Sequence, residues 1–214
     1  VLVTNSAQTG VALGNTSGTL AFSSFGIDGA GNRGFAVDGG SPTLTVDLIT
    51  PTGIQNTTGA VVQVIGTTGG SVTFSGGKIS SVNGGGIDVD DGVASVSFNS
   101  PVSVTNPTGH ALSVQDRSGA VYLAEFDATT TGYSGVFASS NTGTLQIADG
   151  TIQTTGARGL HIGTSVLDLN LSSVVVDNAN GGSAVDITNG TGTTNVGLLD
   201  VTFDGLGAGW AIVL

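Results

Sequence analysis

The sequence predicts an all-β protein in which residues 1–214 form one domain, a single-stranded, right-handed parallel β-helix. Three observations predict this fold. An apolar–x–apolar triplet recurs every 24–27 residues, similar triplets follow it within each repeat, and glycine and small polar residues fill the intervals. Such a repeat is typical of a solenoid, in which each coil buries its apolar side chains by stacking on the next coil.

The first triplet of each repeat marks the start of a coil. Alternate side chains of a strand point to opposite faces, so each triplet places two apolar side chains inward and one side chain outward. Helical spacing of apolar residues is nearly absent, which argues against helices between the strands. About nine coils follow from the first triplets, which are Val11–Leu13, Phe35–Val37, Val62–Val64, Ile87–Val89, Leu112–Val114, Val136–Ala138, Leu160–Ile162, Val185–Ile187 and Trp210–Ile212.

A second triplet follows the first after nine or ten residues, and a less regular third triplet follows in some repeats. The second triplets are Leu20–Phe22, Leu44–Val46, Val72–Phe74, Val96–Phe98, Val121–Leu123, Leu145–Ile147, Leu169–Leu171 and, more loosely, Val196–Leu198. The third triplets are Phe25–Ile27, Val102–Val104, Val174–Val176 and Val201–Phe203. Three short strands per repeat predict one triangular coil, and the preference of parallel crossovers predicts its right hand. Both ends of the sequence fall inside a coil, so we expect a segment of a longer chain with flanking domains.

The composition excludes several classes of function. There is no cysteine for a disulfide framework, a thiolate zinc site or a cysteine nucleophile. Four basic residues against fifteen acidic ones cannot form the phosphate-binding surface that DNA or RNA requires, so no nucleic-acid partner is expected. No apolar run approaches the length of a membrane span, so insertion into a membrane is not expected either.

Three short phrases carry a resemblance to a known family, namely Asn15–Leu20, Thr68–Gly77 and Asn141–Ile147. They resemble the Asn-Thr-Gly-Gly-Thr-(Val/Ile)-Thr-Phe-Ser-Gly repeats of large bacterial cell-surface and secreted right-handed β-helix proteins, among them adhesins. The resemblance covers nearly the entire chain. It implies an extracellular or cell-surface location, with a glycan or the surface of a host or neighbouring cell as partner. Pectin-lyase-like enzymes and phage tailspikes share this architecture, so the resemblance leaves their functions open.

Outward residues of the first strands form a column of candidate site residues along the solenoid. The column is Ala12, Ala36, Gln63, Asp88, Ser113, Phe137, His161, Asp186 and Ala211. Asp88 and Asp90 share one face about 7 Å apart, a separation found among the carboxylate pairs of glycosidases. Together with Asp91 they could instead bind Ca²⁺, or they could form a solvated strand end before a glycine turn.

His161 and Asp186 are neighbours in this column, on adjacent coils about 4.8 Å apart. They could form a His–carboxylate hydrogen bond, with Arg158 just before the strand to bind an acidic sugar. The pair has no evident nucleophile or second acid, and Asp88 lies three coils away, about 14 Å from His161 at strand spacing. The alternative is an ordinary polar pair on a wet surface.

Two outward aromatic residues are candidate ligand contacts together with Arg158. Phe137 interrupts the polar column of the first strands, and Tyr122 stands in the second-strand face, which is otherwise rich in Thr and Ser. Exposed aromatic rings commonly contact sugars or protein partners. The hydroxyl-rich face itself follows from the β-propensity and solubility of Thr and Ser, although flat Thr arrays also bind ice.

The sequence therefore favours a structural or adhesive segment, a rigid stalk with a surface for a glycan or a protein. One alternative is a polysaccharide lyase or glycoside hydrolase that uses Asp88, Asp90, His161 and Asp186. A phage tailspike-like receptor-binding domain is the other. Two features argue against an enzyme: few basic residues are present to bind an acidic substrate, and no long loops interrupt the coils to surround it. No cofactor is expected apart from Ca²⁺ at the aspartates.

Overall fold

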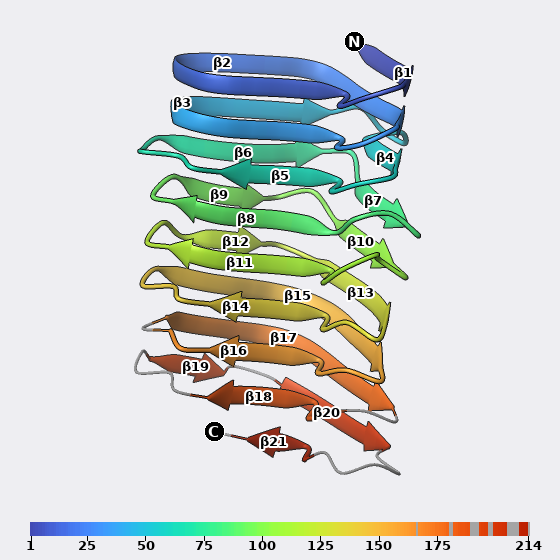
Figure 1. Ribbon diagram of the computed structural model, residues 1–214, viewed down its shortest axis with the longest axis vertical. Coiled ribbons are helices and arrows are strands. Elements are labelled where there is room, and N and C mark those ends of the chain that lie inside the picture. The colour runs from blue at the N-terminus through green and yellow to red at the C-terminus, as the bar shows by residue number, and fades with distance from the viewer. Residues whose placement is uncertain (166, 180–181, 189–192, 197–198, 205–209, 214) are drawn as a thin grey trace.

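In a computed structural model, the chain forms a parallel β-solenoid of about eight turns (Figure 1). The structure describes residues 1–165, 167–179, 182–188, 193–196, 199–204 and 210–213. Within these ranges all regular elements are strands, and none is a helix that could cross a membrane. The predicted all-β parallel solenoid is confirmed, whereas its right hand stays a prediction.

The strands form one continuous sheet that winds around the core and gives each coil three faces. The first face contains the starts of β2 (Val11–Ala30) and β3 (Phe35–Leu48), then β5 (Val62–Ile65), β8 (Ile87–Gly92), β11 (Leu112–Arg117), β14 (Val136–Ser139), β16 (Leu160–Gly163), β18 (Val185–Thr188) and β21 (Ile212–Val213). The second face contains the middle of β2 and the end of β3, then β6 (Ser71–Gly76), β9 (Ser95–Phe98), β12 (Val121–Leu123), the first halves of β15 (Thr144–Thr155) and β17 (Asp168–Ala179), and β19 (Thr194–Val196). The third face contains β1 (Leu2–Ser6), the end of β2, β4 (Ile54–Thr57), β7 (Ile79–Val82), β10 (Val102–Thr105), β13 (Phe126–Thr131), the second halves of β15 and β17, and β20 (Leu199–Asp204).

Backbone pairing confirms the predicted outward column of the first face from Ala12 to Asp186. Each member pairs with its equivalent in the next coil, as Ala12–Ala36, Ala36–Gln63, Gln63–Asp88, Asp88–Ser113, Ser113–Phe137, Phe137–His161 and His161–Asp186.

The last repeat differs from the prediction. Asp186 pairs with Val213 rather than with Ala211, so the predicted triplet Trp210–Ile212 is displaced by two residues. A shift of two keeps every side chain on its face, and the apolar pattern therefore could not distinguish the two registers. Part of another predicted triplet, residues 197–198, lies outside the described residues.

One corner of the solenoid is built from a column of left-handed residues that follow the first strand. Each has a positive φ and lies one coil further along the chain than the previous member: Asn15 (48°), Gly39 (78°), Gly66 (63°), Asp91 (41°), Asp116 (50°), Ser140 (57°) and Thr164 (42°). Glycine, Asn and Asp adopt this conformation most readily. The corner repeats because each coil must turn at the same place to keep its strands paired.

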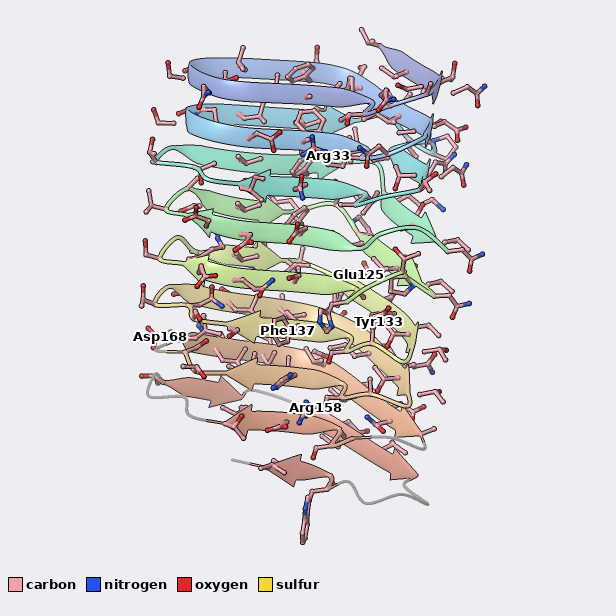
Figure 2. All side chains as sticks on the ribbon, in the orientation of Figure 1. Arg33, Glu125, Tyr133, Phe137, Arg158 and Asp168 are labelled. Carbon is pink, nitrogen blue, oxygen red and sulfur yellow. The ribbon has the colours of Figure 1, made fainter. Side chains whose placement is uncertain are left out.

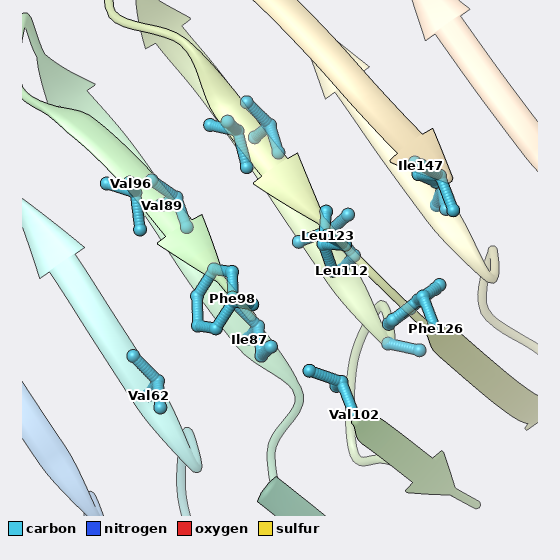
Figure 3. Close-up of a cluster of buried hydrophobic side chains, with 14 of the residues drawn as sticks. Val62, Ile87, Val89, Val96, Phe98, Val102, Leu112, Leu123, Phe126 and Ile147 are labelled. Carbon is cyan, nitrogen blue, oxygen red and sulfur yellow. The ribbon is translucent and has the colours of Figure 1, made fainter. Parts of the chain in front are cut away.

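The core consists of stacked apolar side chains from all three faces (Figure 3). Its largest members include Phe35, Phe74 and Phe98, which are all fully buried. Phe74 stacks on Phe98 with ring centroids 5.3 Å apart, and it meets Phe35 edge-on at 5.5 Å. Burial of each such side chain stabilises the fold by about 1.5–3 kcal/mol, and this packing holds the outward columns in a fixed geometry.

Candidate functional site

The first face carries four aromatic rings on neighbouring coils, His110, Tyr133, Phe137 and His161, which we call the aromatic cluster. Phe137 lies on β14 and His161 lies beside it on β16. His110 and Tyr133 lie in the segments that lead into β11 and β14. Tyr133 and Phe137 are labelled in Figure 2, with Arg158 on the coil below.

Phe137 is the centre of the aromatic cluster. The ring of His110 stacks on it with centroids 4.6 Å apart and an interplanar angle of 14°. His161 contacts it at 5.2 Å and 61°, and Tyr133 meets His110 edge-on at 6.1 Å and 85°. The charge distribution of aromatic rings favours both the stacked and the edge-on arrangement. The sequence predicts an exposed Phe137. In the structure Phe137 is half-buried, because the two imidazoles cover its ring.

A backbone hydrogen bond fixes the orientation of His110. The N–H of Ser134, on the next coil, donates to His110 Nδ1 at 3.2 Å. Nδ1 is therefore the unprotonated nitrogen, and the neutral ring carries its hydrogen on Nε2. The Nε2–H remains a donor for another group.

Arg158 and Asp186 form an ion pair at the edge of the aromatic cluster. Arg158 Nε lies 2.5 Å from Asp186 Oδ2, and the side chains are 44% and 7% exposed. The register places Asp186 beside His161, as predicted, but its carboxylate binds Arg158 in place of the expected imidazole. A guanidinium is charged at neutral pH and therefore binds a carboxylate more strongly than a neutral imidazole does. The second oxygen, Oδ1, is buried without a hydrogen-bond partner.

Both histidines of the aromatic cluster favour the neutral form. Burial lowers the pKa of His110 below its usual value near 6.5, and the neighbouring His161 lowers it further. Burial also lowers the pKa of His161, with a smaller contribution from the positive charge of Arg158 that Asp186 opposes. At pH 7 the cluster is therefore uncharged, apart from the compensated ion pair.

The aromatic cluster lines a surface hollow of about 530 Å³, together with Arg158. The remaining lining residues are small: Gly132, Ser134, Gly156, Ala157 and Gly182. Small residues at these positions leave the rings and the guanidinium accessible from solvent. An apolar ring surface with a few polar donors is the combination found in binding sites for small polar molecules such as saccharides.

The structure brings together four of the residues that the sequence singled out, namely Phe137, Arg158, His161 and Asp186. Tyr122 lies elsewhere, on β12 in the second face, where it pairs with Ser97 and Gln146.

His110 and Tyr133 belong to the site although sequence analysis did not include them. For His110 a signal existed: it stands two residues before the first strand of its coil, the position that Arg158 holds two coils later. Backbone hydrogen bonds confirm this column, because Ala111 donates to the carbonyl of Ser134, and Gly135 donates to the carbonyl of Arg158. For Tyr133 the signal is its place only four residues before Phe137 in the sequence.

The predicted carboxylates lie farther along the first face. Gln63 Nε2 donates to Asp88 Oδ2 at 2.8 Å, and Arg33 in turn donates to Gln63 Oε1 and pairs with Asp38 at 3.2 Å. Arg33 is labelled in Figure 2. Asp88 is thus one end of a polar network across three coils, and it lies three coils from His161, as predicted.

Asp90 and Asp91 have different environments. Burial raises the pKa of Asp90, as do the charges of Asp88, Asp116 and Asp91, against a hydrogen bond from the Asp91 N–H. Asp91 is exposed in the left-handed corner and has a backbone role there. Within the described ranges, no three His, Asp or Glu side chains form a group that could hold a metal ion, so Ca²⁺ at these aspartates stays a prediction.

A second hollow, of about 580 Å³, lies at the left-handed corner beside Asp91, Asp116 and Arg117. Arg117 is only 2% exposed, and its Nη2 donates to the carbonyl of Ala94 at 2.5 Å. Its Nε and Nη1 have no hydrogen-bond partner. Burial lowers the pKa of Arg117 to about 10, although Asp90 and Asp91 partly oppose this. We interpret the buried charge of this guanidinium as destabilising the folded chain.

Fold and site together define the class of protein as a parallel β-solenoid with an aromatic surface cluster. No protein-family model, no curated protein and no solved structure matches the chain.

Proposed function

We propose that this chain is a structural and adhesive β-solenoid segment of a bacterial surface or secreted protein, and that it binds a saccharide at the aromatic cluster. Backbone pairing links neighbouring coils from β1 to β21, so each coil is stabilised by the coils on either side. Such a rod holds its surface at a fixed distance from whatever anchors it. This is the role of a stalk.

The observation that carries the binding function is the packing of four aromatic rings around one surface hollow. Aromatic rings pack against the apolar faces of sugar rings, while N–H and O–H groups at their edges bind sugar hydroxyls. His110 Nε2–H, the Tyr133 hydroxyl and the Arg158 guanidinium are available types of donor. The hollow therefore suits a polar molecule with one flat apolar side.

Binding fits the aromatic cluster better than catalysis does. Its carboxylate, Asp186, is 7% exposed and engaged by Arg158. A general base must reach the proton that it removes, and a buried, paired carboxylate does not meet this requirement.

A polysaccharide hydrolase remains a second candidate because of Asp90. Its pKa is raised, and its side chain shares one side of β8 with the carboxyl group of Asp88, so two carboxyl groups in different environments lie on one face. The test is release of reducing ends from a panel of polysaccharides. Turnover that disappears in Asp90→Asn would support this candidate, and no turnover would exclude it for that panel.

The binding function is tested with a glycan array, followed by calorimetry on the saccharides that bind. We expect Tyr133→Ala and Phe137→Ala to weaken binding at least about tenfold, a loss of about 1.4 kcal/mol. Tyr122→Ala is the matched control, because it removes the same ring from the second face. Absence of any glycan binding, or an equal loss in Tyr122→Ala, would contradict the proposal.

A further inference from the structure

We infer that the saccharide bound at the aromatic cluster carries a carboxylate, which the guanidinium of Arg158 binds, and that acidification strengthens this binding through His110 and His161. This inference rests on the proposed function and specifies its ligand.

Arg158 is the accessible cation of the hollow. Its side chain is 44% exposed and lines the hollow, and its Nε pairs with the Asp186 carboxylate, which is 7% exposed. An ion pair of this kind fixes the guanidinium in one position, so less side-chain entropy is lost when a ligand binds. The planar fork of donors matches a carboxylate.

The charge around the hollow differs from that of the rest of the chain. The whole chain carries a formal net charge of −11, which repels anions in general. Among the described residues that line this hollow, however, are Arg158 and two histidines but no aspartate or glutamate. The Asp186 carboxylate, which pairs with Arg158, is only 7% exposed. The hollow is thus an exception on an acidic molecule, and local charge favours an anion there.

Two imidazoles contact Phe137 beside Arg158, those of His110 and His161. The groups that face them are Tyr133 and the Ser134 N–H at His110, and Arg158 and Asp186 at His161. Burial lowers the pKa of both rings, with a smaller contribution from His161 at His110 and from Arg158 at His161, so both rings are mainly neutral at pH 7. Below their pKa values, protonation adds up to two positive charges beside Arg158. A bound carboxylate favours these charges, so by linkage protonation of the rings favours the carboxylate.

The test compares free acids with their methyl esters, which keep the sugar ring and remove the charge. The probes are short oligosaccharides of glucuronate, galacturonate and sialic acid, with binding measured by calorimetry at pH 7.5 and 5.0. The carboxylates stay ionised at both values. We expect the acid to bind more tightly than the ester, with a ratio that grows on the order of tenfold at pH 5.0 if one imidazole pKa rises by about one unit.

Two variants separate the parts of the inference. Arg158→Gln should abolish the preference for the acid, so that the acid and its methyl ester bind equally. Arg158→Gln alone would leave the buried Asp186 carboxylate without its ion-pair partner. The double variant Arg158→Gln/Asp186→Asn therefore repeats the measurement without an unpaired carboxylate. His110→Gln/His161→Gln should remove the pH dependence and keep the preference at pH 7.5.

The outcomes are distinguishable. Equal binding of acids and esters at both pH values would overturn the inference and leave the proposed function intact. Absence of binding by every probe, including the neutral members of the glycan array, would overturn both. Retention of the acid preference in both Arg158 variants would also overturn the inference.

Discussion

The imidazole ring of His110 lies almost parallel to the phenyl ring of Phe137, with centroids 4.6 Å apart, although the two residues belong to different coils. The stack is fixed on one side by the N–H of Ser134 and on the other by the edge-on contact of His161 with Phe137. Each imidazole is thereby shielded from water by the same phenyl ring.

This arrangement predicts a measurable effect on imidazole titration. Phe137→Ala should raise the pKa of His110 and of His161 toward about 6.5, because it exposes both rings to water. The measurement is an NMR pH titration of the two imidazoles. The control is Tyr122→Ala, which should leave both titrations unchanged. Unchanged pKa values of both imidazoles in Phe137→Ala would show that burial by this ring does not lower them.

The same two histidines predict how stability depends on pH. Their pKa values are lowered in the folded chain, so the unfolded chain binds protons more readily. Their contribution to stability is fully present above the unfolded pKa of about 6.5, and it is lost as the pH falls from there toward the lowered folded values. Thermal unfolding between pH 7.5 and 5 should show this decrease. The double variant His110→Gln/His161→Gln should flatten it, and an equal slope in that variant would contradict the assignment.

The raised pKa of Asp90 predicts a change of stability with pH of the opposite sign. Its pKa is raised in the folded chain, so its favourable contribution is present below about pH 3.8 and is lost as the pH rises through the folded value. Asp90→Asn should therefore raise the melting temperature at pH 7 by a degree or two, a small effect because the group is partly solvated. The difference should vanish near pH 3. Asp88→Asn is the control that should not stabilise, because Asp88 accepts a hydrogen bond from Gln63.

Close contact between coils predicts a graded series of glycine substitutions. Gly40 has a φ of 78°, and a Cβ added there would lie 2.0 Å from the carbonyl oxygen of Thr16. Gly40→Ala should cost about 2 kcal/mol or more, because left-handed strain adds to a backbone clash. Gly18 has a φ of 82° with open space around it, so Gly18→Ala should cost about 1 kcal/mol.

The control of this series is Gly14→Ala, where an added Cβ meets nothing within 4 Å. It should be nearly neutral in denaturant unfolding. Equal losses for Gly40→Ala and Gly18→Ala would show that the coils do not approach as closely as described at Gly40.

The buried guanidinium of Arg117 leads us to expect that an apolar residue at this position stabilises the fold. Its pKa is lowered to about 10 by burial, and two of its three nitrogens lack partners, so its charge destabilises the fold at pH 7. Arg117→Met fills a similar volume without the charge, and it should leave the melting temperature unchanged or raise it. Arg117→Ala should lower it, because a cavity of several methylene groups remains. A large loss in Arg117→Met would mean that the hydrogen bond to the Ala94 carbonyl outweighs the buried charge.

The sequence by itself determined the solenoid and the order of its outward columns. Parallel coils must place equivalent residues above one another, so a triplet that recurs every 24–27 residues already places Phe137, His161 and Asp186 in one column. The period of two also separates inward from outward side chains. It could not settle the register of the final rung at Val213, because a shift of two residues preserves that separation.

Only the tertiary structure decided which side chains meet. Register gives the neighbour of a residue on the next coil, but a long side chain reaches past that neighbour. Arg158, for example, forms an ion pair with Asp186, the residue that register places beside His161. His110 reaches Phe137 from the segment that leads into β11, outside any strand. The register places His110 and Arg158 in one column, but whether their side chains meet Phe137 and Asp186 depends on rotamers and on the path of the chain through the corners, which the repeat does not specify.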